Sequence, residues 1–81
     1  NLPTVEIKLN NKNSINIIDL FIITKIENSK SEVRRLIKGK GVRINNDLIN
    51  DEKFLIQKKL FVNNFIKLSI GKKKHVKIKL S

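Results

Sequence analysis

The side chains of this 81-residue chain with the clearest chemical potential are basic. Six of them fall within one short segment that holds all three arginines of the chain: Lys30, Arg34, Arg35, Lys38, Lys40 and Arg43. A planar guanidinium can donate two parallel hydrogen bonds to one phosphate. Only Glu32 offers an opposite charge nearby, and like charges four residues apart, such as Arg34 and Lys38, repel each other. The segment predicts a phosphate-binding surface, and the alternative is an ordinary solvated helix face.

A second basic cluster lies near the end of the chain. It consists of Lys72, Lys73 and Lys74, with further lysines nearby in sequence or on the same expected sheet face: Lys58, Lys59, Lys67, Lys77 and Lys79. A lysine-rich turn can bind RNA, but it also protects a hairpin from pairing with other strands, so both interpretations stay open. Stacking on bases is poorly supported, because there is no Tyr or Trp and Phe21, Phe54 and Phe61 are expected in the core. We expect contacts with backbone phosphates rather than with base edges.

Groups that catalyse reactions or bind metals are scarce. The carboxylates are few and scattered, and His75 sits in a strand pattern beside lysines. One His without any Cys cannot build a zinc site. Gly39 and Gly41 follow an expected helix, whereas a phosphate-cradling glycine loop precedes one. A chain of this length also has little material for both a core and a deep cleft. We therefore expect no catalytic residue, no metal and no cofactor in this domain.

The overall charge points in the same direction as the basic segment. Eighteen Lys and Arg against seven Asp and Glu give a net charge of +11, which predicts a polyanionic partner. A codon bias of an AT-rich genome is the alternative, because Ile, Lys and Asn make up 40 of the 81 residues. The longest apolar stretch, 15–26, contains polar residues and is too short to span a bilayer. With no signal peptide visible, a cytoplasmic location without a membrane partner is expected.

Two helices are expected to position these residues. The first runs from Ile15 to about Ile26 after Ser14 as N-cap, with a buried strand as the alternative. The second begins with a capping box of Ser29 and Glu32. One arc of it is apolar and the other side polar or basic, with Val33, Leu36 and Ile37 facing away from Ser31, Arg34, Arg35 and Lys38. The glycines of 39–41 then end the helix by adopting the left-handed conformation.

Alternating apolar and polar residues predict short strands around these helices. They are expected at Val5–Leu9, at 42–44 and 47–49 around an Asn45–Asn46 turn, and in a C-terminal hairpin at about 65–80 with Gly71–Lys74 at its turn. Phe54–Ile56 is either a strand edge or a helical turn. The expected fold class is α+β: two helices in the N-terminal half pack on a small, mainly antiparallel sheet of four to five strands. Residues 1–81 are expected to form one domain, and the absence of Met predicts that the chain is either processed or, as we favour, a fragment of a longer chain.

The segment Ser29–Lys38 followed by Gly41–Asn45 resembles the RNA-binding module named after small-subunit ribosomal protein four. That module recurs in ribosomal proteins, pseudouridine synthases and bacterial tyrosyl-tRNA synthetases, and its core here covers residues 15–49. The flanking segments favour one of these three families. Pro3–Val5, and Phe65–Leu68 leading into Gly71–His75, are similar to the C-terminal domain of bacterial tyrosine–tRNA ligases.

This resemblance implies a function and a set of contacts. In that family the domain grips tRNA between the anticodon stem and the long variable arm, while a separate domain of the parent enzyme activates tyrosine with ATP. The implied RNA contacts are Lys30, Arg34, Arg35 and Lys38 on the second helix and Lys72–Lys74 in the hairpin. Asn46 stands where Gly is usual and His75 where an aromatic is common, which puts a stacking role at position 75 in doubt.

The implied partner is tyrosine tRNA, with a homodimeric parent and a monomeric isolated domain. One alternative is a stand-alone or ribosome-associated RNA-binding module, and another is the RNA-delivery domain of a pseudouridine synthase. Attachment to an anionic membrane surface is disfavoured, because the cationic helix lacks exposed apolar anchors.

Overall fold

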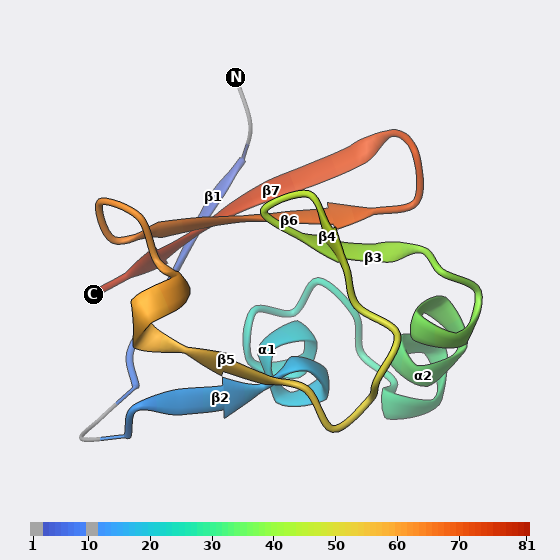
Figure 1. The fold of residues 1–81 in the computed structure, drawn as a ribbon. Coiled ribbons are helices and arrows are strands. Elements are labelled where there is room, and N and C mark those ends of the chain that lie inside the picture. Colours follow the sequence, from blue (N-terminus) through green and yellow to red (C-terminus); the bar gives the residue numbers. More distant parts are fainter. Residues whose placement is uncertain (1–2, 10–11) are drawn as a thin grey trace.

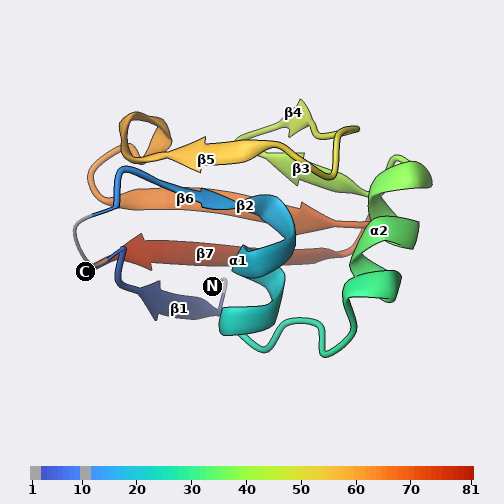
Figure 2. The same ribbon diagram turned by 90° about the horizontal axis from the view of Figure 1, so that it is seen from below.

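A five-stranded sheet is covered on one face by two helices and a two-stranded ribbon (Figures 1 and 2). The structure is a computed structural model that describes residues 3–9 and 12–81. Its elements in chain order are β1 (Thr4–Ile7), β2 (Ser14–Asn16), α1 (Ile17–Ile23), α2 (Lys30–Lys38), β3 (Val42–Ile44), β4 (Asp47–Leu48), β5 (Leu55–Gln57), the 3-10 helix η1 (Lys58–Leu60), β6 (Phe65–Ile70) and β7 (Lys74–Leu80). The expected α+β class is confirmed.

The sheet has the strand order β1-β7-β6-β3-β4. Every neighbouring pair is antiparallel except β1 and β7, which run parallel. The expected C-terminal hairpin is confirmed, with Leu68 opposite Val76 and Ile66 opposite Ile78. Because side chains alternate between faces along a strand, this register places all four of these residues on the face that meets the helices.

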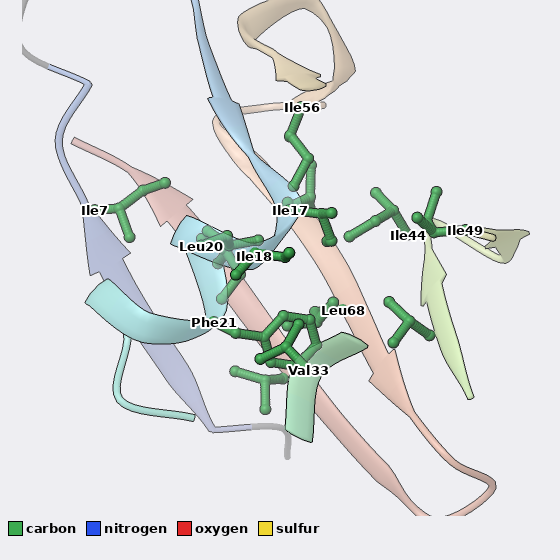
Figure 3. Packing of buried hydrophobic residues seen from close by; sticks show 14 of the residues in the cluster. Ile7, Ile17, Ile18, Leu20, Phe21, Val33, Ile44, Ile49, Ile56 and Leu68 are labelled. Carbon is green, nitrogen blue, oxygen red and sulfur yellow. The ribbon is translucent and has the colours of Figure 1, made fainter. Parts of the chain in front are cut away.

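The core lies between the sheet and the helical layer. Phe21 of α1 and Val33 of α2 are both fully buried and belong to the same core cluster as the buried Leu68 of β6 (Figure 3). Ile56 of β5, in the two-stranded ribbon, is also fully buried in this cluster. Apolar burial of this kind is the main stabilising contribution in a domain of this size, at ~25 cal/mol per Å² of apolar surface.

The first helix begins later and ends earlier than its pattern predicts. Ser14 is not its N-cap, because Ser14–Asn16 forms β2 and pairs with β5, with Ile15 opposite Ile56. Asn16 is the N-cap instead, and its Oδ1 accepts a hydrogen bond from Ile18 N at 2.9 Å. The helix ends at Ile23, where the Thr24 hydroxyl donates to Leu20 O at 2.7 Å. The strand alternative therefore holds for Ile15 and Asn16 alone among the residues of the expected helix. The open alternative at 54–56 resolves as a strand, because Leu55 and Ile56 belong to β5, which pairs with β2.

The second helix begins at the predicted residue, with the serine half of the capping box formed and the Glu32 carboxylate beside Arg35 instead. Ser29 is the N-cap, and its Oγ accepts a hydrogen bond from Glu32 N at 3.5 Å. Its apolar arc faces inward, since Val33 and Ile37 are buried, whereas Arg34 and Arg35 are exposed. The capping signal and the amphipathic spacing were therefore sufficient to place this helix and its orientation.

The end of α2 differs from the prediction in one respect. Gly39 has φ −80°, and the left-handed residue is Lys40, with φ 59°. The two backbone hydrogen bonds of a Schellman motif are present. Lys40 N donates to Ile37 O at 3.1 Å, and Gly41 N donates to Leu36 O at 2.9 Å. Glycine suits position 41 for reasons of space, because a Cβ there would lie 3.3 Å from Leu36 O and the backbone would have to shift slightly.

Replacing Lys40 with glycine should therefore stabilise the fold by about 1 kcal/mol, because glycine adopts the left-handed conformation without the steric cost of a Cβ. The change in the free energy of unfolding can be measured by urea denaturation. Lys40→Ala removes the same charge but keeps the Cβ, so it should give no comparable gain. Equal stabilisation by both variants would mean that charge repulsion, rather than backbone strain, is relieved.

The turn between β3 and β4 is as predicted. Asn45 and Asn46 have φ 51° and 76°, the left-handed pair of a tight hairpin turn. Asn45 also ties this turn to its neighbours, since its Oδ1 accepts from Lys67 N at 2.9 Å and its Nδ2 donates to Leu60 O at 3.2 Å. The short β3–β4 hairpin is thereby held against β6 and η1.

Candidate nucleic-acid interface

The outward side of α2 forms a basic stripe. Lys30, Arg34 and Lys38 are spaced by four residues and so lie one above the other along the helix, with Arg35 beside them. All four are exposed. Ser31, Arg34, Arg35 and Lys38 line an open hollow of about 340 Å³. Because Val33 and Ile37 anchor the opposite side of the helix in the core, the stripe is held facing solvent.

Each guanidinium of the stripe contacts one carboxylate. Arg34 Nε lies 3.6 Å from Glu52 Oε2, and Arg35 Nη1 lies 3.4 Å from Glu32 Oε1. The arginine side chains remain 47% and 78% exposed. Exposed pairs of this kind contribute only ~0.2–1 kcal/mol, and a guanidinium has five N–H donors, so most of its donors stay available to a phosphate.

Glu52 was not anticipated as a partner of this helix. It lies in the segment after β4, far from Arg34 in the sequence, and no local pattern signals the contact. Its neighbour Asp51 accepts a turn hydrogen bond from Phe54 N at 3.0 Å, which helps to set the course of the loop. Only the folded chain brings this carboxylate to the basic stripe.

The structure brings only Lys72–Lys74 of the second basic cluster to the end of α2. Lys67, Lys77 and Lys79 project from the other face of the sheet, and Lys58 and Lys59 lie in η1. Gly71 N, at the turn between β6 and β7, donates to Gly41 O at 2.7 Å, just beyond the end of α2. The turn that carries Lys72 and Lys73, and Lys74 after it, therefore lies next to the end of the helix near Lys38 and Lys40, as both views show (Figures 1 and 2). We call the combined surface of Lys30, Arg34, Arg35, Lys38, Lys40 and Lys72–Lys74 the basic end.

Arg43 belongs to a different surface. Its neighbours Val42 and Ile44 are buried, whereas Arg43 is exposed. In the register of the sheet it lies opposite Ser69, which lies opposite His75. These three residues therefore project from the face of the sheet that the helices do not cover. The sequence grouped Arg43 with the helix because the two are close in the chain, but the reversal at 39–41 separates their side chains.

His75 has a hydrogen-bond partner within the sheet. Its Nδ1 lies 3.0 Å from Ser69 Oγ, and Ser69 is buried. Within residues 3–9 and 12–81, no group of three or more His, Cys, Asp or Glu side chains is arranged to hold a metal ion. In the same part of the chain, neither helix has the length and apolar character needed to cross a bilayer.

Comparison with known proteins identifies the family. The model of the tyrosine–tRNA ligase SYY-like C-terminal domain matches residues 1–78. The tyrosine–tRNA ligase of Pelagibacter ubique is 57% identical over 81 residues, which cover 99% of this chain and 20% of that protein. The ligase of Bartonella henselae is 46% identical, with 98% of this chain and 19% of that protein covered. For the ligase of the Wolbachia of Brugia malayi the identity is 44%, covering 85% of this chain and 17% of that protein.

The chain thus spans about a fifth of the length of these relatives. The family match covers both helices, the hairpin turn at 71–73 and nearly all of β7. It therefore includes every residue of the basic end. The sequence resemblance and the fold agree with it, and the chain belongs to the family of tyrosine–tRNA ligase SYY-like C-terminal domains.

Proposed function

We propose that this chain is the tRNA-binding C-terminal domain of a tyrosine–tRNA ligase. In this proposal residues 1–81 act as one RNA-binding domain of a longer enzyme and contact the phosphate backbone of tyrosine tRNA at its anticodon stem and long variable arm. The domain catalyses no reaction itself, and it supports tyrosylation by holding the tRNA. The observation that carries the proposal is the basic end, where α2 and the β6–β7 turn meet.

The chemistry of the basic end suits a phosphate backbone. Arg34 and Arg35 have donors available to a phosphate, and the lysines add point charges that need no fixed geometry. From Lys30 to Lys38 the helix is ~12 Å long at 1.5 Å per residue, which is enough to contact more than one phosphate of a strand. The family match favours this RNA over the partners of a ribosome-associated module or of a pseudouridine synthase.

The remaining parts of the proposal concern the parent enzyme. Tyrosine and ATP bind in the separate catalytic region, which leaves this domain without a cofactor of its own. The parent is a cytoplasmic homodimer, and the isolated domain is a monomer. Size-exclusion chromatography with light scattering tests the last statement, because a concentration-independent dimer of the domain would contradict it.

The affinity for tyrosine tRNA should fall steeply with salt. About six phosphate contacts at the basic end release about as many counterions, so the logarithm of the association constant should fall with log salt with a slope near ~5. Fluorescence anisotropy with labelled tRNA, between about 50 and 200 mM salt, measures this slope. A slope near zero would exclude phosphate contacts as the source of binding.

Recognition of the long variable arm can be tested separately. A tRNA of the same overall fold with a short variable arm should bind more weakly than tyrosine tRNA at equal salt. Equal affinities combined with a steep salt slope would retain the basic end as an RNA-binding surface but would reject the variable arm as its target.

A further inference from the structure

The uncovered face of the five-stranded sheet carries its own ordered set of side chains. Three rows cross it in the register of the strands. The first row is Arg43, Ser69 and His75; the second is Lys67, Lys77 and Thr4; the third is Phe65, Lys79 and Glu6. No described helix or strand covers this face (Figures 1 and 2). We call it the open sheet face.

Phe65 differs from the other phenylalanines of the chain. Phe21 is fully buried, and Phe54 and Phe61 are partly buried against the core cluster. Phe65 is not among the residues of that cluster or those packed on it, and it shares the outward parity of Lys67 and Ser69 in β6. The ammonium Nζ of Lys77 lies 5.3 Å from the centroid of its ring. The ring is therefore an aromatic surface presented among cations.

The charges of the open sheet face are unbalanced. Four basic residues project from it, namely Arg43, Lys67, Lys77 and Lys79. Among the outward positions of the described strands, Glu6 is the one acidic residue, opposite Lys79. Leu48, 38% exposed, is the one aliphatic side chain in these positions, so the face lacks the apolar area that a lipid surface or a protein core would need.

We propose that the open sheet face binds unpaired RNA nucleotides, with a base stacked on Phe65 and the adjoining phosphates held by Lys67, Lys77, Lys79 and Arg43. Phe65 is half-buried, and its ring lies on an uncovered sheet face among cations. This arrangement suits single-stranded RNA, because its bases are free to stack while its backbone is charged. The Lys77 ammonium, held over the ring in the free protein, moves to a phosphate when a base arrives. Ser69 fixes the position of His75 within the same surface.

This surface is separate from the basic end. The open sheet face lies on the side of the sheet away from the helical layer, whereas the stripe of α2 lies within that layer (Figure 2). The two sites differ in chemistry as well, because the basic end offers cations alone and the open sheet face adds an aromatic ring. The inference therefore stands independently of the proposed contacts of α2 with tRNA.

The test uses a short single-stranded RNA that contains 2-aminopurine, a base whose fluorescence is quenched when it stacks. Binding to the chain should quench the fluorescence. Phe65→Leu keeps an apolar side chain but removes the ring, and it should abolish the quenching and weaken binding of the oligonucleotide about tenfold. Phe61→Leu is the matched control, since Phe61 packs against the core and should leave the quenching unchanged.

Two further measurements keep the inference testable if Phe65→Leu folds poorly. In the unmodified chain, NMR amide shifts on adding the oligonucleotide should concentrate in β6 and β7, and shifts confined to α2 would overturn the inference. A polyglutamate peptide of equal charge should compete weakly. Competition as strong as that of RNA, or unchanged quenching in folded Phe65→Leu, would also overturn it.

The failure of this inference can be distinguished from the failure of the proposed function. Arg34→Ala combined with Arg35→Ala should lower affinity for folded tRNA but leave quenching of the single-stranded probe intact. Phe65→Leu should abolish quenching of the single-stranded probe but leave the affinity for folded tRNA intact. Loss of both activities in each variant would overturn the separation of the two surfaces.

Discussion

Alanine at both Arg34 and Arg35 should weaken binding of tyrosine tRNA about 30-fold at ~0.15 M salt, since two phosphate contacts and their released counterions are lost. The salt slope should decrease by ~2 for the same reason. The melting temperature should hardly change, because both side chains are exposed and their ion pairs contribute little. Anisotropy titrations and thermal unfolding monitored by circular dichroism measure these effects.

The control removes two positive charges from another part of the molecule. Lys12 precedes β2 and Lys58 lies in η1, and these elements lie at the opposite end from α2 (Figure 1). Lys12→Ala with Lys58→Ala should change tRNA affinity much less than the arginine pair. Equal losses in the two double variants would mean that net charge, rather than the basic end, determines binding.

Glu52→Gln provides a complementary test of the arginine site. The carboxylate of Glu52 lies 3.6 Å from Arg34, so we expect it to compete with a tRNA phosphate for this guanidinium. Removing its charge should leave tRNA affinity equal to or above that of the unmodified chain. A marked loss of affinity would instead show that Glu52 is needed to hold Arg34 in its binding position.

Phe21→Ala should destabilise the fold by about 3–5 kcal/mol, the range for truncating a buried aromatic ring. Phe21 is fully buried, and its ring lies beside Val33 of α2 (Figure 3). A domain of this length has a total stability of only about 4–12 kcal/mol, so much of the variant population should unfold under mild conditions. Urea denaturation measures the loss as a shift in the midpoint.

The matched control for this variant lies on the same helix. Ile23 is 51% exposed, and Ile23→Ala should change the free energy of unfolding by no more than about 0.5 kcal/mol, as is usual for exposed positions. Similar losses in the two variants would contradict the packing of α1 described above. Because Phe21 supports α2, its truncation should also lower tRNA binding in proportion to the unfolded fraction.

Features with a local physical origin could be predicted from the sequence. The capping serine at position 29 and the spacing of Val33 and Ile37 predicted α2 and its exposed basic side, because both depend on contacts within a few residues. The alternation of 65–70 and 75–80 likewise predicted the hairpin and its buried face, although the second strand begins one residue earlier, at Lys74. Whether the basic residues contact RNA stays a prediction.

Other features could not be predicted, because each depends on a partner far away in the chain. Residues 14–16 form a strand only because β5 offers its hydrogen-bonding edge, although their local pattern is compatible with a helix. Glu52 reaches Arg34 across a loop. The alternation of β6 places Phe65 on the same face as Lys67 and Ser69, but no local pattern shows that the fold leaves this face uncovered.

The amino-acid sequence by itself determined the α+β class, the amphipathic α2, the C-terminal hairpin and the large positive charge. Capping and side-chain periodicity depend on residues close together in the chain, and net charge is a sum over the composition. Only the tertiary structure decided which basic residues lie at the basic end and which lie on the open sheet face. The bond from Gly71 to Gly41 joins the hairpin lysines to α2, and strand register sends Arg43 to the open sheet face beside Lys67. Register and loop closure depend on long-range pairing, which no short segment encodes.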